Sequence, residues 1–377
     1  MSSSDVYTRL AREVLEPMKQ DFVGKDEIID LLGICLVAGE NLFILGPPGT
    51  AKSALVHQLA ARLEGRTFDY LLTRFTEPNE LFGPFDIRKL REGELETNTE
   101  GMLPEASLVF LDELLNANSA ILNSLLVALN ERMFRRGKET RPLAALLFVG
   151  ASNHLPEDDA LLALFDRFLL RVSCDNVPAD RLADVLRAGW NLLSKPPARS
   201  SVHFDHLRSA QADLHRVAVD PVRSVFADLV LRIRHAGIPL SDRRAVKLQR
   251  VAAASALLSG RTEVALSDLW VVRHTWDTEE QREILAGIVD QVIASGVPEP
   301  TDHPRSRPAA GPDPEALARE LESIAAAATA ETLTDPERSR LRDRLTVLEG
   351  RCPWIADPAR RTWLLERVAL LWSHFKP

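Results

Sequence analysis

Short apolar runs without polar alternation recur through the first half of the chain. Each is followed by a turn or by a helical pattern, and together they cover residues 42–45, 68–72, 108–111, 146–150 and 168–172. A strand that helices cover on both faces needs apolar residues at every position, as in a parallel sheet. The pattern therefore predicts an α/β fold with a parallel sheet in a first domain, residues 1–177.

Helical spacing and turn signals fill the intervals between these runs. Residues 119–132 place apolar side chains on one face of a predicted helix: Ile121, Leu122, Leu125, Leu126 and Leu129. Two other stretches, 82–101 and 131–142, have short β-like arms around the turns REGE and RRGK. They predict two hairpin inserts.

The pattern changes near residue 178. Up to residue 296 the strand signals vanish and amphipathic helices follow one another, which predicts a second, all-helical domain over 178–296. Six prolines between Pro298 and Pro314 predict an extended linker over 297–314. The last segment, 315–377, is predicted to be a small helical module.

The amino-acid composition limits which binding partners and which cell compartment we expect for this protein. The net charge of −8 over 377 residues argues against a general surface for polyanions, so nucleic acid is not the expected partner. The three cysteines are far apart and have no CxxC spacing, which suits a reducing compartment. The N-terminal segment has no continuous apolar stretch, so neither a signal peptide nor a membrane span is predicted. We expect a cytoplasmic protein.

The segment NLFILGPPGTAKSALV, residues 41–56, is typical of a phosphate-binding loop. Gly46, Lys52 and Ser53 match the pattern G-x-x-x-x-G-K-[ST], and Ala51 replaces its second glycine. In such a loop the lysine reaches the β- and γ-phosphates of ATP, and the serine hydroxyl takes a Mg²⁺ position. The expected cofactor-binding residues are Gly46, Pro47, Pro48, Gly49, Thr50, Ala51, Lys52, Ser53 and Ala54.

The alanine before the lysine need not impair this loop. Ala51 stands where the chain is entering a helix, so we expect a negative φ there. In a helical turn alanine is favoured over glycine by roughly 1 kcal/mol. Gly46 and Gly49 still supply the flexible positions.

Two adjacent carboxylates follow the apolar run of SLVFLDEL, residues 107–114. The carboxyl ends of parallel strands are where open α/β folds bind ligands. Asp112 is suited to hold Mg²⁺ through its water shell, and Glu113 is suited to polarise an attacking water, which predicts hydrolysis. The next run ends in Asn153, whose amide is a candidate to position the same water, although turn chemistry is its usual role.

Five motifs in this order carry a family resemblance. GPPGTAKS, FLDEL, VGASN, LFDRF and SDRR resemble the MoxR branch of AAA+ ATPases, and most closely its RavA group. The match covers roughly residues 20–290. Alanine before the P-loop lysine is common in that branch, so Ala51 resembles a family feature. The C-terminal region is shorter than that of the RavA group, and partners known through it are not carried over.

The resemblance implies a ring, usually a hexamer, with ATP bound between neighbouring subunits. It assigns Arg167 of LFDRF to the neighbour's γ-phosphate; the alternative is a surface ion pair with Asp166 or Glu157. It also assigns the lid-domain arginine called sensor 2 to Arg243, although Arg244 follows directly and leaves the choice open.

The resemblance implies contacts for the base and for substrates as well. The segment 21–28 is similar to the stretch that packs against adenine, with Val23 and Gly24 as the nearest contacts. The two inserts match elements that face the pore in related rings, where Arg135, Arg136 and Lys138 are candidates to touch a substrate; solvated turn charges are the alternative.

Three functions compete at this point. The first is a ring-forming ATPase that remodels or matures a protein partner, together with a protein bearing a von Willebrand factor A (vWA) domain, a partner that the resemblance alone implies. The second is a nucleic-acid-directed AAA+ motor or loader. The third is a scaffold whose assembly is gated by ATP.

Overall fold

The computed structural model describes residues 3–92, 95–177, 181–194, 202–297, 299–306, 314–328, 335–352, 355 and 358–375. The chain divides into two compact units, Met1–Ser306 and Arg307–Pro377. Within the described residues, no helix is both long enough and apolar enough to span a membrane.

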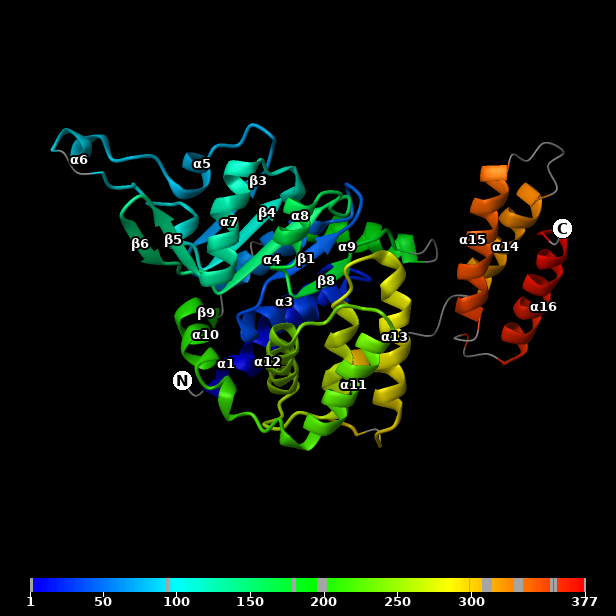
Figure 1. Cartoon of the computed structure of the whole chain (residues 1–377). Helices are drawn as coiled ribbons and strands as arrows, with labels where there is room; N and C mark the ends of the chain where they lie inside the picture. Colours follow the sequence, from blue (N-terminus) through cyan, green and yellow to red (C-terminus); the bar gives the residue numbers. More distant parts are fainter. Residues whose placement is uncertain are drawn as a thin grey trace. The chain divides into compact units, whose positions relative to one another are not determined.

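A parallel sheet of five strands forms the centre of the first unit (Figure 1). In spatial order the strands are β3 (Thr67–Leu71), β4 (Leu108–Asp112), β7 (Leu147–Ser152), β1 (Leu42–Leu45) and β8 (Leu170–Ser173). Every residue of β1 and β7 is buried, which explains why these strands carry no polar alternation. The predicted α/β fold with a parallel sheet is confirmed.

Helices cover the sheet because each presents an apolar face to it. The covering helices include α3 (Asp26–Ala38), α4 (Lys52–Arg62), α7 (Ser119–Glu131) and α8 (Asp159–Phe165). The α7 helix buries most of the face predicted for it, and the Asn118 side chain caps its start by accepting from the N–H groups of Ala120 and Ile121. A continuous N-terminal helical stretch precedes them: α1 (Ser3–Arg9), a π-helical segment (Leu10–Leu15) and α2 (Glu16–Asp21).

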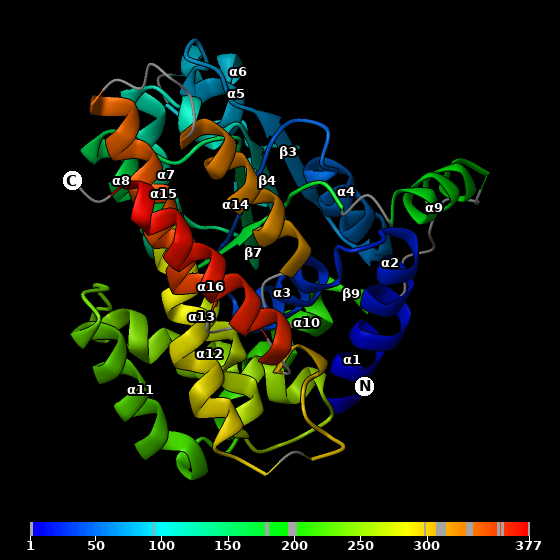
Figure 2. The same ribbon diagram turned by 90° about the vertical axis from the view of Figure 1, so that its right-hand side faces the viewer.

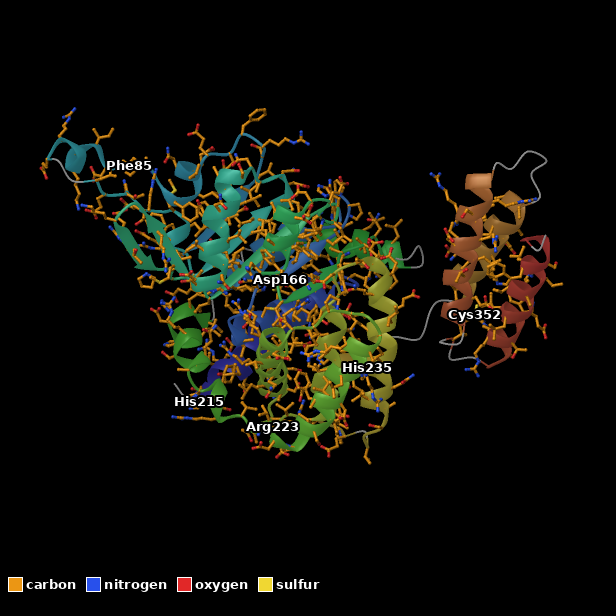
Figure 3. All side chains as sticks on the ribbon, in the orientation of Figure 1. Phe85, Asp166, His215, Arg223, His235 and Cys352 are labelled. Carbon is orange, nitrogen blue, oxygen red and sulfur yellow. The ribbon has the colours of Figure 1, made fainter. Side chains whose placement is uncertain are left out.

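The two predicted inserts follow β3 and α7 along the chain. The second insert is the antiparallel hairpin of β5 (Met133–Arg136) and β6 (Glu139–Pro142). The short helix α5 (Pro78–Phe82) leads into the first, which contains α6 (Ile87–Arg91) between arms that meet at a bridge between Phe85 and Thr97. The Arg136 guanidinium stacks on the Phe85 ring at 3.8 Å from its centroid and donates to the Gly83 carbonyl. Phe85 is labelled in Figure 3. The two inserts therefore contact each other.

The region after β8 is mainly helical. Its helices are α9 (Leu182–Ser194), α10 (Phe204–Gln211), α11 (Arg223–His235), α12 (Asp242–Leu258) and α13 (Glu279–Ala294). A strand pair interrupts this pattern, because β9 (Val202–His203) pairs in parallel with β2 (Leu63–Glu64). The expectation that strands vanish here is wrong for these two residues, since a two-residue pairing leaves no periodic signal. Short 3₁₀ turns connect the elements: Leu103–Glu105, Leu114–Asn116, Leu214–Arg216, Asp220–Val222, Leu266–His274 and Pro304–Ser306.

Part of the proline-rich segment is packed against the first unit. Arg305 pairs with Asp26 at 2.9 Å and with Asp30 at 3.1 Å. The buried His303 ring stacks on Trp270, and burial together with nearby cations lowers the pKa of His303 to about 3. The expected extended linker is therefore wrong for residues 299–306, because composition does not show these partners. Residues 307–313 of that prediction lie outside the described residues.

Three helices form the second unit: α14 (Pro314–Ala328), α15 (Asp335–Arg351) and α16 (Pro358–Phe375). They enclose a separate apolar core of Leu317, Leu321, Ile324, Leu341, Leu345, Leu348, Cys352, Ile355, Leu364, Val368 and Leu371. Cys352 is labelled in Figure 3. This unit has its own hydrophobic core, as the predicted module requires.

The helical region contains a buried carboxylate, Asp268, and replacing it tests what holds this region together. Asp268 accepts from Arg261 at 2.6 and 2.7 Å, from the Ser255 hydroxyl at 2.8 Å and from the Ala265 N–H at 2.9 Å. We expect Asp268→Ala to lower the free energy of unfolding by about 3–5 kcal/mol, because it leaves these donors buried and unpaired. Chemical denaturation measures this difference.

The matched control is an exposed ion pair in the same region. Asp220 pairs with Arg223 at 2.6 Å, and both side chains are mostly exposed. Asp220→Ala should change the free energy of unfolding by less than about 1 kcal/mol. Equal losses in the two variants would contradict a structural role for the Asp268 network.

Candidate nucleotide site

A glycine is required where the loop leaves β1, because the backbone of β8 comes very close. The Gly46 N–H donates to the Ser152 carbonyl at 3.0 Å, and the Cys174 N–H donates to the Leu45 carbonyl at 2.7 Å. A Cβ atom at Gly46 would lie 2.3 Å from the Cys174 carbonyl oxygen. The first glycine of the motif is therefore set by close approach of two backbone segments.

The conformation of Ala51 differs from the expectation. Its φ is +73°, in the left-handed region, and α4 begins only at the next residue. The expected negative φ is wrong because Ala51 turns the chain into the helix instead of lying within it. This conformation costs an L-residue roughly 1–2 kcal/mol, which the usual glycine avoids. Gly49 also has a positive φ, of +82°.

The lysine of the motif lies inside the loop. Lys52 is 7% exposed, and its ammonium donates to the carbonyls of Gly46 at 2.6 Å and Pro47 at 3.1 Å. The Thr50 hydroxyl also donates to the Pro47 carbonyl, at 2.9 Å. The loop residues that surround this charge are exposed, namely Pro47, Pro48 and Gly49. A positive charge therefore lies at the N-terminus of α4, where the helix itself favours an anion.

The Ser53 hydroxyl and the first strand-end carboxylate are in direct contact. Ser53 Oγ donates to Asp112 Oδ2 at 2.9 Å, while Asp112 Oδ1 accepts from the Glu113 N–H at 3.0 Å. Glu113 has a φ of +49° and caps the following turn. Mg²⁺ binds proteins through oxygen donors, commonly one or two carboxylates together with phosphates and water. The donor set of Ser53 and Asp112 fits this ion.

Sheet order brings Asn153 to the same place. It follows directly after β7, and β7 lies between β1 and β4. The Asn153 side chain is exposed, as is that of Ala54 in the first turn of α4. Since the strands are parallel, Asn153 lies at the same edge as the loop and the two carboxylates.

A cavity of about 430 Å³ adjoins the loop. Its walls come from the N-terminal segment at Asp21–Lys25, from Gly49–Ala51, from Asp175–Val177 and from α9. Val23 lines it, whereas Gly24 turns the chain with a φ of +74° and lies close to Val177. Its volume falls in the range of small-ligand sites, and its position beside a phosphate loop suits a nucleoside.

Sequence reasoning missed the α9 wall of this cavity. Val185, Ala188 and Leu192 face it at helical spacing, and the Lys25 ammonium donates to the Asp175 carbonyl beside it. The amphipathic spacing of residues 182–193 could have shown the helix. It could not have shown what the helix faces.

Two predicted arginines lie away from the loop, at the opposite edge of the sheet. Arg167 precedes β8, and its side chain pairs with Asp166 at 3.1 Å. Its backbone carbonyl accepts from the Asn41 side-chain amide at 2.8 Å. Asn41 precedes β1, whose four residues separate it from Gly46 by about 16 Å. Figure 3 labels Asp166. Arg167 is therefore not brought to its own phosphate loop.

The two candidate lid arginines have different surroundings. Arg243 is exposed and donates to Asn130 near the end of α7, at the same edge as Arg167. Arg244 is buried, donates to the Thr275 carbonyl at 2.7 Å and pairs with Asp277 at 3.2 Å. Arg171 shares Asp277, and burial and Arg244 lower the pKa of Arg171 to about 9. Arg244 thus belongs to a buried ion-pair cluster.

Comparison with known proteins identifies the family. A family model described as the MoxR domain in the MoxR-vWA-beta-propeller ternary systems matches residues 8–212. The chain belongs to the MoxR family. An AAA lid domain model matches residues 222–289, within the helical region.

Relatives of this MoxR chain support the assignment. An uncharacterised protein of Methanocaldococcus jannaschii is 33% identical over 294 residues, which cover 76% of this chain and 75% of that protein. The chaperone MoxR1 of Mycobacterium tuberculosis is 28% identical over 60% of each chain. The crystal structure of a putative ATPase from Cytophaga hutchinsonii matches with a TM-score of 0.64 and 20% identity, covering 78% of this chain and 96% of that one, which shows the fold.

These findings confirm a MoxR-family AAA+ ATPase with a helical lid. The family and the fold imply an ATP hydrolase. The finer resemblance to the RavA group stays a prediction.

The close contact at Gly46 yields a test of the loop. We expect Gly46→Ala to lower ATP affinity at least about tenfold, because the added methyl group forces the loop away from Cys174. Titration with a fluorescent ATP analogue measures the affinity.

Ala51→Gly is the matched control. Glycine relieves a left-handed strain of roughly 1 kcal/mol and loses a similar amount through the greater freedom of the unfolded chain. ATP affinity and stability should therefore stay near those of the unmodified protein. A similar loss of affinity in both variants would contradict the role given to close approach at Gly46.

Proposed function

We propose that this MoxR protein hydrolyses ATP at the seam between two copies of the chain and uses the energy to remodel a protein partner. One observation carries the proposal: the phosphate loop and the catalytic carboxylates lie at one edge of the sheet, and Arg167 and Arg243 lie at the other. Each copy therefore carries both halves of a site, but at opposite edges of its sheet, so a complete site needs two copies.

Within one copy, the loop side of the site binds and orients the nucleotide. Lys52 contacts the β- and γ-phosphates, exchanging its loop carbonyls for phosphate oxygens. Ser53 and Asp112 would hold Mg²⁺, which would neutralise charge on the phosphates when bound. Glu113 accepts a proton from the attacking water, and Asn153 orients that water.

The neighbouring copy completes the site with arginines. Arg167 leaves Asp166 and pairs with the terminal phosphate, where an arginine in trans contributes about 10³–10⁵ in rate. Arg243 is the second donor in preference to Arg244, because Arg243 is exposed and Arg244 is held by Asp277 and Thr275. The closed form of such an assembly is a ring, for which we propose a hexamer.

A mixing experiment tests the shared site. Glu113→Gln alone should lose about 10² in kcat and Arg167→Ala about 10³, both with ATP binding retained. Mixed assemblies of the two variants should recover activity, because Glu113 of one copy meets Arg167 of another. ATPase rates of the mixture and of each variant alone measure this recovery.

The control mixes Lys52→Ala with Glu113→Gln. Both changes lie on the loop side, so no seam in the mixture has an intact loop half and activity should stay low. If the Glu113→Gln and Arg167→Ala mixture also stays inactive while mixed oligomers form, Arg167 does not act across the seam.

A protein partner is favoured over nucleic acid by the charges of the inserts. Arg136 is occupied by Phe85 and Gly83, and Arg135 pairs with Glu131 at 2.6 Å. The net charge of −8 adds no general attraction for phosphate backbones. The matching family model is named after systems that contain a vWA protein and a β-propeller. We take a vWA-domain protein as the partner.

Purified components test the partner. A vWA-domain protein from the same genome should raise the ATPase rate severalfold, whereas single- or double-stranded DNA at physiological salt should leave it unchanged. The Lys52→Ala variant controls for contaminating ATPases. Stimulation by DNA alone would support the motor function instead.

A further inference from the structure

Helix α9 carries two neighbouring apolar stripes. The first, with Val185, Ala188 and Leu192, lines the nucleotide cavity. The second lies on the adjacent face, with exposed fractions of 67% for Leu186, 76% for Trp190 and 83% for Leu193. Positions spaced by three and four residues share a helix face, so these three form a continuous stripe. We call it the α9 stripe.

The α9 stripe is unusual for a surface helix. Figure 2 shows α9 at the rim of the first unit beside α2, and the two helices are in contact. Within the described residues of that unit, the three side chains remain largely uncovered. Contiguous exposed apolar side chains that include a tryptophan mark an interaction surface.

We propose that a second copy of this chain covers the α9 stripe, and that its arginine-bearing edge is the docking surface. This inference rests on the proposed function. The cavity that α9 lines is continuous with the phosphate loop, and Arg167 of a second copy must reach the terminal phosphate there. The seam between copies therefore runs beside α9.

The arginine-bearing edge offers matching apolar side chains. Leu162 on α8 is 44% exposed and lies five residues before Arg167. Val246 on α12 is 61% exposed and lies one helical turn after Arg243. Both therefore lie close in the chain to the arginines that enter the neighbour's site. The α9 stripe and this edge together bury apolar surface that each copy alone exposes to water.

The arrangement couples assembly to nucleotide binding. One face of α9 forms a wall of the nucleotide cavity, while the other face docks on the neighbour. Docking therefore holds the wall in place, and ATP affinity rises when copies associate. By linkage, ATP strengthens association by the same factor.

The first experiment compares association in the Glu113→Gln background, which binds ATP and should turn it over about 10²-fold more slowly. The double change Leu186→Glu and Trp190→Glu should weaken self-association in ATP at least about tenfold, measured by analytical ultracentrifugation. Both positions are exposed, so the far-ultraviolet spectrum and the unfolding midpoint should be unchanged. Arg187→Ala, on the same helix and at a side chain that pairs with the exposed Asp184, is the matched control and should associate normally.

The second experiment pairs the two surfaces. Leu162→Glu should also prevent larger assemblies from forming. A mixture of Leu162→Glu with the Leu186→Glu, Trp190→Glu chain has one intact α9 stripe and one intact arginine-bearing edge. It should form 1:1 dimers and nothing larger.

Three outcomes would overturn the inference. The first is normal assembly of the α9 variant. If the C-terminal helices of that variant also become protease-sensitive, those helices cover the α9 stripe in place of a second copy. The second is a mixture that stays monomeric. The third is an unmodified chain that does not associate in ATP, which would also remove the proposed seam. Recovery of activity on mixing Glu113→Gln with Arg167→Ala, combined with normal assembly of the α9 variant, would reject this inference alone.

Discussion

The common direction of the five strands is the constraint on which the site depends. Because the strands are parallel, their carboxyl ends place the loop after β1, the carboxylates after β4 and Asn153 after β7 at one edge. The same direction places the residues before the strands at the opposite edge, where Arg167 lies. An arginine side chain does not span the sheet, so Arg167 cannot reach the loop of its own copy.

The loop half of the site is held in conformations that local preference disfavours. Ala51 and Glu113 both have positive φ, and Gly46 is pressed against the backbone at Cys174. Such positions persist only where the surroundings determine them, here the fully buried strands β1 and β7. The buried Lys52 ammonium adds a charge that the loop carbonyls satisfy. The rigid sheet thus maintains a strained, charged loop ready for an anion.

Two incomplete features of the first unit have the same explanation. Arg167 and Arg243 lie away from the phosphate loop, at another surface. The nucleotide cavity has a wall, α9, whose outer face remains apolar and exposed. In the assembly that we propose, a second copy supplies what both features need, and association in one direction around a closed ring satisfies every copy equally. A vWA-domain partner would then act on the assembled form.

The sequence by itself determined the elements whose signal is local. Unbroken apolar runs identified the five strands, and the order of Lys52, Asp112, Glu113 and Asn153 indicated the chemistry, because each follows the carboxyl end of a strand along the chain or lies at it. Tertiary structure alone decided the left-handed Ala51, the packing of residues 299–306, the burial of Arg244 beside the exposed Arg243, and the α9 wall of the cavity. Each of these depends on contacts with residues far away in the chain, such as Cys174 with Gly46 or Arg305 with Asp30, and local periodicity carries no record of them.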